Sequence, residues 1–171
     1  MSIKRRVEQA LRPLLGMELV NFGRAGNMGC FEIAERLWHK PSKDIERVGP
    51  LLVIHVQCPW RFIGRDMVIV GSRDMYLPAG NSLKVPPVFN WDVPGANRCD
   101  ERMKQLLGDT DSHFVIEQIE ADSTGAVRLS MSEGYRLEII PDTSAETEHW
   151  RLLGPGAPRD HFVVSGGIIE D

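Results

Sequence analysis

A cysteine and a histidine lie three residues apart in residues 54–62, which read Ile-His-Val-Gln-Cys-Pro-Trp-Arg-Phe. These are His55 and Cys58, and a thiolate beside an imidazole base is the pairing that cysteine nucleophiles use. Along a β-strand, however, side chains three residues apart point to opposite faces. Cys58 would instead share a face with the apolar residues Leu52 and Val56. We therefore expect a buried structural thiol and no cysteine nucleophile.

The other residues that could do chemistry do not form a known motif. No pair of cysteines or histidines has the spacing of a zinc finger or a zincin. The segment Gly23–Gly29 has the pattern G-x-x-G-x-x-G, which differs from the dinucleotide fingerprint and is typical of a hairpin turn. No G-x-S-x-G nucleophile elbow occurs. The sequence thus predicts no metal, no cofactor and no enzyme activity. The scattered histidines are His39, His55, His113, His149 and His161.

A cluster of carboxylates lies beside a tryptophan in residues 142–150. Two interpretations remain open. In the first, the segment is a solvated turn with the indole tucked under it. In the second, it is a recognition patch in which tryptophan anchors a partner and carboxylates attract basic groups. The candidate partner-binding residues are Asp142, Glu146, Glu148 and Trp150, with Asp109 and Asp111 as weaker candidates.

The elements that must position these residues begin with an amphipathic helix over residues 3–15, which Ser2 can cap and Gly16 can end. Pro13 conflicts with a clean last turn, so this helix is expected to stop near Arg12. Residues 17–22 and 30–34 alternate apolar and polar side chains and predict a hairpin around Gly23–Gly29. Further expectations are a polar loop at 39–50, a strand at 51–57 that Pro59 interrupts, and a strand at 67–70.

The second half of the chain reads as a long irregular loop, a short helix and a meander. The loop spans residues 77–98, and the helix spans 99–107. Strands are predicted at 114–120, 127–131 and 135–140, with short segments at 149–153 and 161–164. The fold class is therefore α+β, mainly antiparallel sheet in hairpins and a meander, with an N-terminal helix and a short central helix.

The composition is typical of one globular domain spanning residues 1–171. The chain has 42% hydrophobic and 26% charged residues, and no apolar run approaches the ~20 residues needed to cross a bilayer. No signal-peptide segment follows the basic start, so we expect a cytoplasmic protein that does not bind membranes. Three widely spaced cysteines do not form a disulfide framework and are typical of a reducing compartment.

The net charge of −4 is unevenly distributed along the chain. Residues 1–98 carry 14 Lys/Arg and 9 Asp/Glu, whereas residues 99–171 carry 6 Lys/Arg and 15 Asp/Glu. The first part thus has a charge of +5 and the second a charge of −9. If the acidic residues also cluster in space, they would attract a basic partner and repel nucleic acid. We expect no direct nucleic-acid binding.

Three phrases of the sequence, LLVIHVQCPWRFIGRDMVIVGSRDMY, YRLEIIPDTSAETEHWRLLGP and HFVVSGGIIE, resemble a group of small bacterial proteins. Some members of that group act as immunity proteins of polymorphic toxin systems, including contact-dependent growth inhibition. The resemblance runs from about residue 51 to the C-terminus. It implies a cytoplasmic protein that binds the toxic C-terminal domain of a cognate effector and blocks its active site or substrate surface. Many such toxins are nucleases, which are basic because they bind phosphates.

Two other classes of function stay open. The chain could be a small enzyme or ligand-binding domain, with a pocket near Cys58, Trp60 and the loop at residues 78–94. A closed apolar cavity lined by polar groups would favour that class. Alternatively, it could be a structural subunit of a larger assembly, which a large apolar surface patch would favour.

Overall fold

The computed structural model describes residues 1–35, 51–82, 84–109, 111–155, 157–158, 161–166 and 168–170. The loop expected at residues 39–50 therefore lies outside the described residues. The helices are α1 (Ile3–Leu11) and α2 (Arg98–Gly108), and 3-10 turns are η1 (Arg12–Leu14), η2 (Ser72–Tyr76) and η3 (Ser132–Gly134). The strands are β1 (Glu18–Ala25), β2 (Met28–Ala34), β3 (Leu51–Val56), β4 (Trp60–Gly64), β5 (Met67–Gly71), β6 (Ile116–Ala121), β7 (Val127–Met131), β8 (Arg136–Ile139), β9 (Glu148–Leu153), β10 (His161–Ser165) and β11 (Ile168–Glu170).

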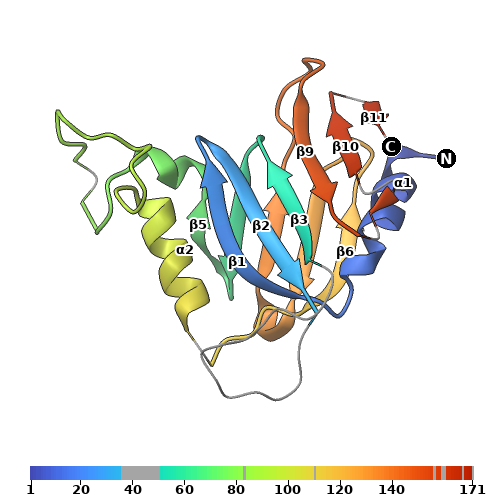
Figure 1. Cartoon of the computed structure of the whole chain (residues 1–171), viewed down its shortest axis with the longest axis horizontal. Helices are drawn as coiled ribbons and strands as arrows, with labels where there is room; N and C mark the ends of the chain where they lie inside the picture. The colour runs from blue at the N-terminus through green and yellow to red at the C-terminus, as the bar shows by residue number, and fades with distance from the viewer. Residues whose placement is uncertain are drawn as a thin grey trace.

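The strands form two antiparallel sheets that face each other (Figure 1). Sheet A has the strand order β1-β2-β3-β9-β10-β11, and sheet B has the order β5-β4-β8-β7-β6. The expected α+β class with mainly antiparallel sheet is confirmed. The sequence pattern predicted one set of hairpins and a meander, whereas the strands divide between two sheets. Hydrophobic side chains from both inner faces belong to one core cluster.

The two sheets are joined at one corner, where the start of β1 meets the start of β6. Glu18 and Val115 form an isolated antiparallel bridge there. On either side of it, the Leu19 N–H donates to the Phe114 carbonyl at 3.1 Å, and the Ile116 N–H donates to the Met17 carbonyl at 2.8 Å. These bonds satisfy backbone groups that an open sheet edge would leave unpaired.

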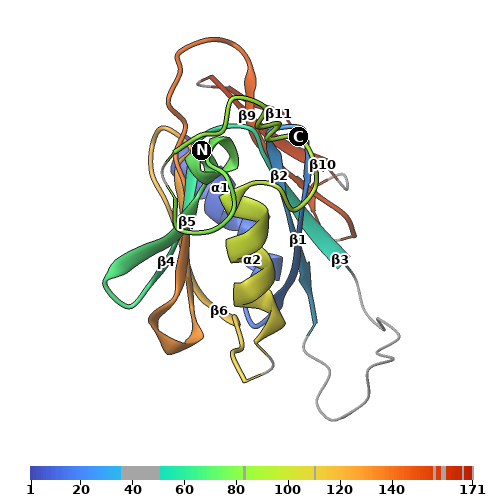
Figure 2. The same ribbon diagram turned by 90° about the vertical axis from the view of Figure 1, so that its left-hand side faces the viewer.

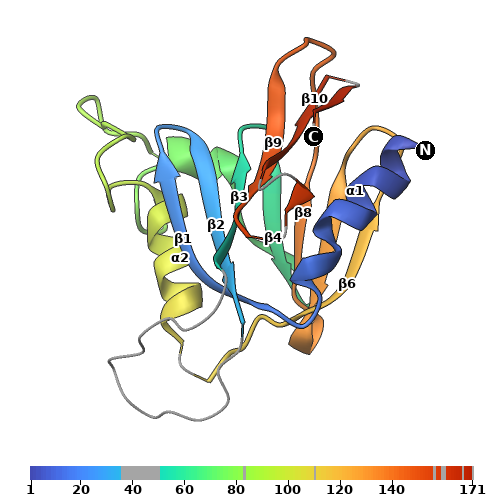
Figure 3. The same cartoon turned by 45° about the vertical axis from the view of Figure 1, so that its right-hand side comes forward.

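Each helix covers one open side of the two sheets. Helix α2 contacts both β1 and β5 and lies between the edges of sheets A and B (Figure 2). Helix α1 contacts β6 on the other side of the molecule (Figure 3). The apolar residues Val7, Ala10 and Leu11 of α1 are buried, as are Cys99 and Met103 of α2. Burial of these faces therefore fixes where both helices lie.

The helix boundaries follow from their caps. The Ser2 side chain accepts the Arg5 N–H, as expected for an N-cap. Helix α1 ends at Leu11, because Pro13 lacks the donor for a further α-helical turn, and one 3-10 turn follows. Helix α2 starts one residue earlier than predicted, because the Asn97 side chain accepts the N–H of Asp100.

Three details of the strand prediction are wrong. The hairpin turn consists of Gly26 and Asn27 alone, and both flanking strands extend toward it. Strand β4 was missed because it is short and begins directly after Pro59. Strand β11 was missed because its three residues are too few to show alternation.

Candidate functional site

The structure separates Cys58 from His55. Cys58 is buried where the chain crosses from sheet A to sheet B, and its N–H donates to the His149 carbonyl at 3.1 Å. His55 is half-buried on β3, paired with Arg151 of β9. Burial raises the pKa of the Cys58 thiol to about 12, and the charge of Asp142 adds to the increase. The thiol is therefore protonated at neutral pH, and the prediction of a buried, free cysteine is confirmed.

Native Cys58 should resist thiol reagents, because reaction needs both access and the thiolate. We expect the half-buried Cys30 to react first, and Cys58 and Cys99 to react only when urea unfolds the chain. Maleimide labelling followed by peptide mass spectrometry measures the three rates separately. Labelling of native Cys58 at its rate in urea would contradict this prediction. The Cys58→Ala variant should lose roughly 1–2 kcal/mol of unfolding free energy.

Among the described histidines, His149 is the buried one, and no function was expected for it from the sequence. Neither ring nitrogen has a hydrogen-bond partner among the described residues. Its carbonyl accepts the N–H groups of Gln57 and Cys58, but its ring is not hydrogen-bonded to the thiol. Within the described residues, no hydrogen bond therefore joins the Cys58 thiol to the imidazole of His149.

Two of the predicted partner-binding residues are exposed on the loop between β8 and β9. Every residue from Asp142 to Thr147 is exposed. The carboxylates of Asp142 and Glu146 form no ion pair within the described part of the chain. The loop projects beyond the ends of the strands (Figure 1). A Cβ added at Gly166 would lie 2.1 Å from the Ala145 carbonyl oxygen, so the turn after β10 supports this loop closely.

Glu148 and Trp150 are not part of that exposed loop, because β9 begins at Glu148. Glu148 is paired with Arg151, which lowers the pKa of the carboxyl despite its burial. The Trp150 side chain is 0% exposed, and its Nε1 donates to the Gly125 carbonyl at 2.9 Å. Assigning Trp150 to an exposed anchor is therefore wrong, and the interpretation that tucked the indole into the core is correct.

Asp109 and Asp111 belong to the segment that follows α2, and this segment lies at the opposite end of the molecule from the loop between β8 and β9 (Figure 1). Asp109 accepts the N–H of Asp111 and the hydroxyl of Ser112, so its carboxylate closes a local turn. The predicted carboxylates thus do not form a single patch.

Arg24 holds the long loop after η2 against β1 and α2. Its Nε and Nη2 donate to both oxygens of Asp100, at 2.8 and 3.1 Å. The remaining donors reach the Asp92 side chain and carbonyl and the carbonyls of Trp91 and Gly26. The Arg24 side chain is only 8% exposed. Because every N–H is engaged, Arg24 stabilises the loop and has no donor left for a ligand.

That loop carries the most exposed apolar residue of the described chain. Val88 is 91% exposed and follows two exposed prolines. Tyr76 packs edge-to-face against Trp91 near the base of the loop, with ring centroids 5.2 Å apart. The base is therefore ordered by aromatic packing, while the loop projects from the molecule (Figure 1).

The outer face of sheet B carries an arginine cluster that sequence analysis missed. The Glu138 carboxylate is 2.6 Å from Arg61 Nε, 3.1 Å from Arg128 Nε and 3.4 Å from Arg136 Nε. Burial alone would raise the pKa of Glu138, but the hydrogen bonds and charges of Arg61 and Arg128 lower it below its usual value. Glu138 is therefore ionised at neutral pH. A polar, period-two pattern at 128–130 and 136–138 was the available signal.

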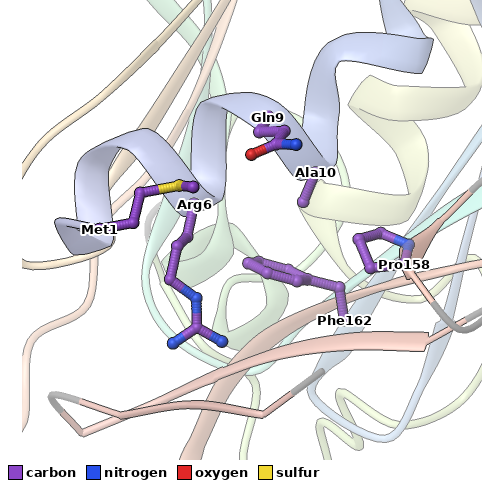
Figure 4. A pocket seen from close by; sticks show the side chains of 6 residues that line it. All are labelled: Met1, Arg6, Gln9, Ala10, Pro158 and Phe162. Carbon is purple, nitrogen blue, oxygen red and sulfur yellow. The ribbon is translucent and has the colours of Figure 1, made fainter.

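Two of the hollows in the described surface are open to solvent. The larger one, about 740 Å³, runs between β1 and α2 and touches the long loop at Asp92, Pro94 and Gly95. The smaller one, about 480 Å³, lies between α1 and β10 and includes Arg6 and Phe162 (Figure 4). Neither hollow is lined by Cys58 or Trp60, so neither is the pocket that was expected beside those two residues.

Comparison of the chain with models of known protein families, with curated proteins and with solved structures finds no match. Within the described residues, no group of three His, Cys, Asp or Glu side chains is arranged to hold a metal ion. No described helix is long and apolar enough to cross a membrane.

Proposed function

We propose that this protein is a cytoplasmic immunity protein that binds a cognate toxin domain and neutralises it without turnover. The resemblance of the three phrases quoted above motivates the proposal. The observation that carries it is the exposed loop at residues 142–147. Its two carboxylates, Asp142 and Glu146, have no ion-pair partner in the described part of the molecule and are held on a projecting segment.

The physical basis is electrostatic attraction followed by occlusion. Because its charge is not neutralised by a partner, a carboxylate on a projecting loop creates a negative potential in the surrounding solvent. This potential can attract a basic surface and increase the association rate. Because the turn after β10 supports the loop closely at Ala145, the loop would lose little conformational freedom on binding. A basic nuclease domain is a partner with the matching charge.

A small-molecule ligand in the groove between β1 and α2 is the second candidate function. The groove has a volume typical of ligand sites. It also borders the loop at residues 78–94, beside which the alternative of a ligand-binding domain placed its pocket. Its best cation, Arg24, is occupied by internal hydrogen bonds, so Lys104 is the lining cation that remains. Release of a co-purified small molecule when the protein is denatured would favour this function.

The double variant Asp142→Lys/Glu146→Lys should slow association with the toxin domain by about tenfold at low ionic strength. The difference should shrink at high ionic strength, because exposed charges are screened by salt. The matched control is Asp66→Lys/Glu117→Lys, which makes the same charge change at exposed positions elsewhere. Binding kinetics with the C-terminal domain of the adjacently encoded effector, and growth on co-expression, are the measurements.

A wild-type protein that neither binds nor protects against that domain would discard the proposed function. If it protects and both double variants associate at the same rate, the function stands and the assignment of the loop is wrong.

A further inference from the structure

The cluster around Glu138 lies on a face of sheet B that no other described element covers. Arg61, Glu138, Arg128 and Glu120 are direct cross-strand neighbours on β4, β8, β7 and β6. Side chains alternate along a strand, and the neighbours of these residues, such as Phe62 and Leu137, are buried in the core. The four charged side chains therefore share the outer face.

Glu138 is only 7% exposed although it lies on this outer face. The guanidinium groups of Arg61, Arg128 and Arg136 surround its carboxylate and exclude water from it. One guanidinium would be enough to neutralise one carboxylate. Three are present, and the second carboxylate nearby, Glu120, is 3.7 Å from Arg128. The cluster therefore keeps a positive charge that internal pairing does not require.

The three arginines also keep donors available. Their side chains are 48%, 52% and 39% exposed, in the order Arg61, Arg128 and Arg136. Each is oriented by its Nε, which faces Glu138. The terminal amino groups of Arg61 and Arg136 have no hydrogen-bond partner among the described residues. Guanidinium groups that are fixed in this way lose little freedom when they bind an anion.

We infer that Arg61, Arg128 and Arg136, oriented by Glu138, form a binding site for the carboxylates of an acidic polypeptide segment. The planar fork of arginine matches a carboxylate with two parallel hydrogen bonds. A nucleic acid fits less well, because its phosphates repeat along a chain and need an extended track of cations. The Glu120 carboxylate, 3.7 Å from Arg128, ends the cluster at β6 and interrupts such a track. This inference does not depend on the proposed function, because a basic partner of residues 142–147 would not supply the ligand.

The test uses the full chain and hexaglutamate as the probe. Titration should shift the Nε–Hε NMR signals of the three arginines saturably. Each of Arg61→Gln, Arg128→Gln and Arg136→Gln should weaken binding by about fivefold, because each removes one charge-assisted contact. The control Arg5→Gln removes the same charge from exposed α1 and should leave the affinity unchanged. Backbone spectra check that each variant is folded.

Arg61→Lys serves as a second variant if a glutamine variant does not fold, since it keeps the charge and loses the fork. It should bind more weakly than the wild type. Absence of a saturable shift, or equal loss in the Arg5→Gln control, would overturn the inference. Tighter binding of hexathymidylate than of hexaglutamate, lost in the same variants, would replace the polypeptide ligand by a nucleic acid.

Discussion

Replacement of Trp150 by alanine should lower the free energy of unfolding by about 3–5 kcal/mol, the usual cost of removing a buried aromatic side chain. The indole is 0% exposed and packs against Phe162, with ring centroids 5.9 Å apart. Its Nε1 also donates to the Gly125 carbonyl, which would lose its partner in a buried position. A loss of this size is a large part of the total stability of a domain.

Denaturant unfolding of the purified variant measures this loss. The control Trp150→Phe keeps an aromatic ring beside Phe162 and removes the hydrogen bond, so it should cost less than the alanine variant. An alanine variant with wild-type stability and weakened toxin binding would contradict the core assignment and restore the interfacial one.

Replacement of Arg24 by methionine should release the long loop after η2 and cost about 3 kcal/mol of unfolding free energy. The substitution leaves the mostly buried carboxylate of Asp100 without its ion-pair partner. Removing one partner of such a pair is strongly destabilising, because the remaining charge is not compensated. It also removes the donors that hold Asp92 and the Trp91 carbonyl. Arg24→Lys should be nearly as costly, because one ammonium cannot replace five donors in a fork.

Hydrogen exchange and limited proteolysis report on the loop directly. We expect faster exchange across residues 84–96 in both Arg24 variants, with strand β3 unchanged if the global fold survives. Arg73→Met is the matched control, because Arg73 is exposed and forms no hydrogen bond with described residues. Wild-type protection of the loop in Arg24→Met would show that the loop is held by other contacts.

Local signals in the sequence predicted the elements that depend on local physics. Ser2 and the apolar face of residues 3–11 specify α1 through its cap and its periodicity. The alternation at 51–56 specifies β3, whose burial alternates in the same way. The division into two sheets has no local signal, because it depends on which strands pair.

The candidate site shows the same limit. Trp150 follows a run of exposed polar residues, so its neighbours in the chain suggest a surface loop. Its burial depends on pairing with Val164 of the next strand and with Val56, which is far away in the sequence. Likewise, the division of the chain into a basic and an acidic part hides the arginine cluster, since Arg61 of the first part and Arg128 of the second lie on either side of Glu138.

The pairing of β3 with β9 also determines the order in which the molecule can be completed. All of sheet B is encoded between these two central strands of sheet A. During synthesis, β3 can bind β2 but has an unpaired edge until residues 148–153 leave the ribosome. Such an edge is prone to aggregation, and pairing between distant segments is slow. Sheet B, whose strands are contiguous in the chain, can form earlier and shield one face of the waiting strands. The synthesis of β9 therefore decides when sheet A can be completed.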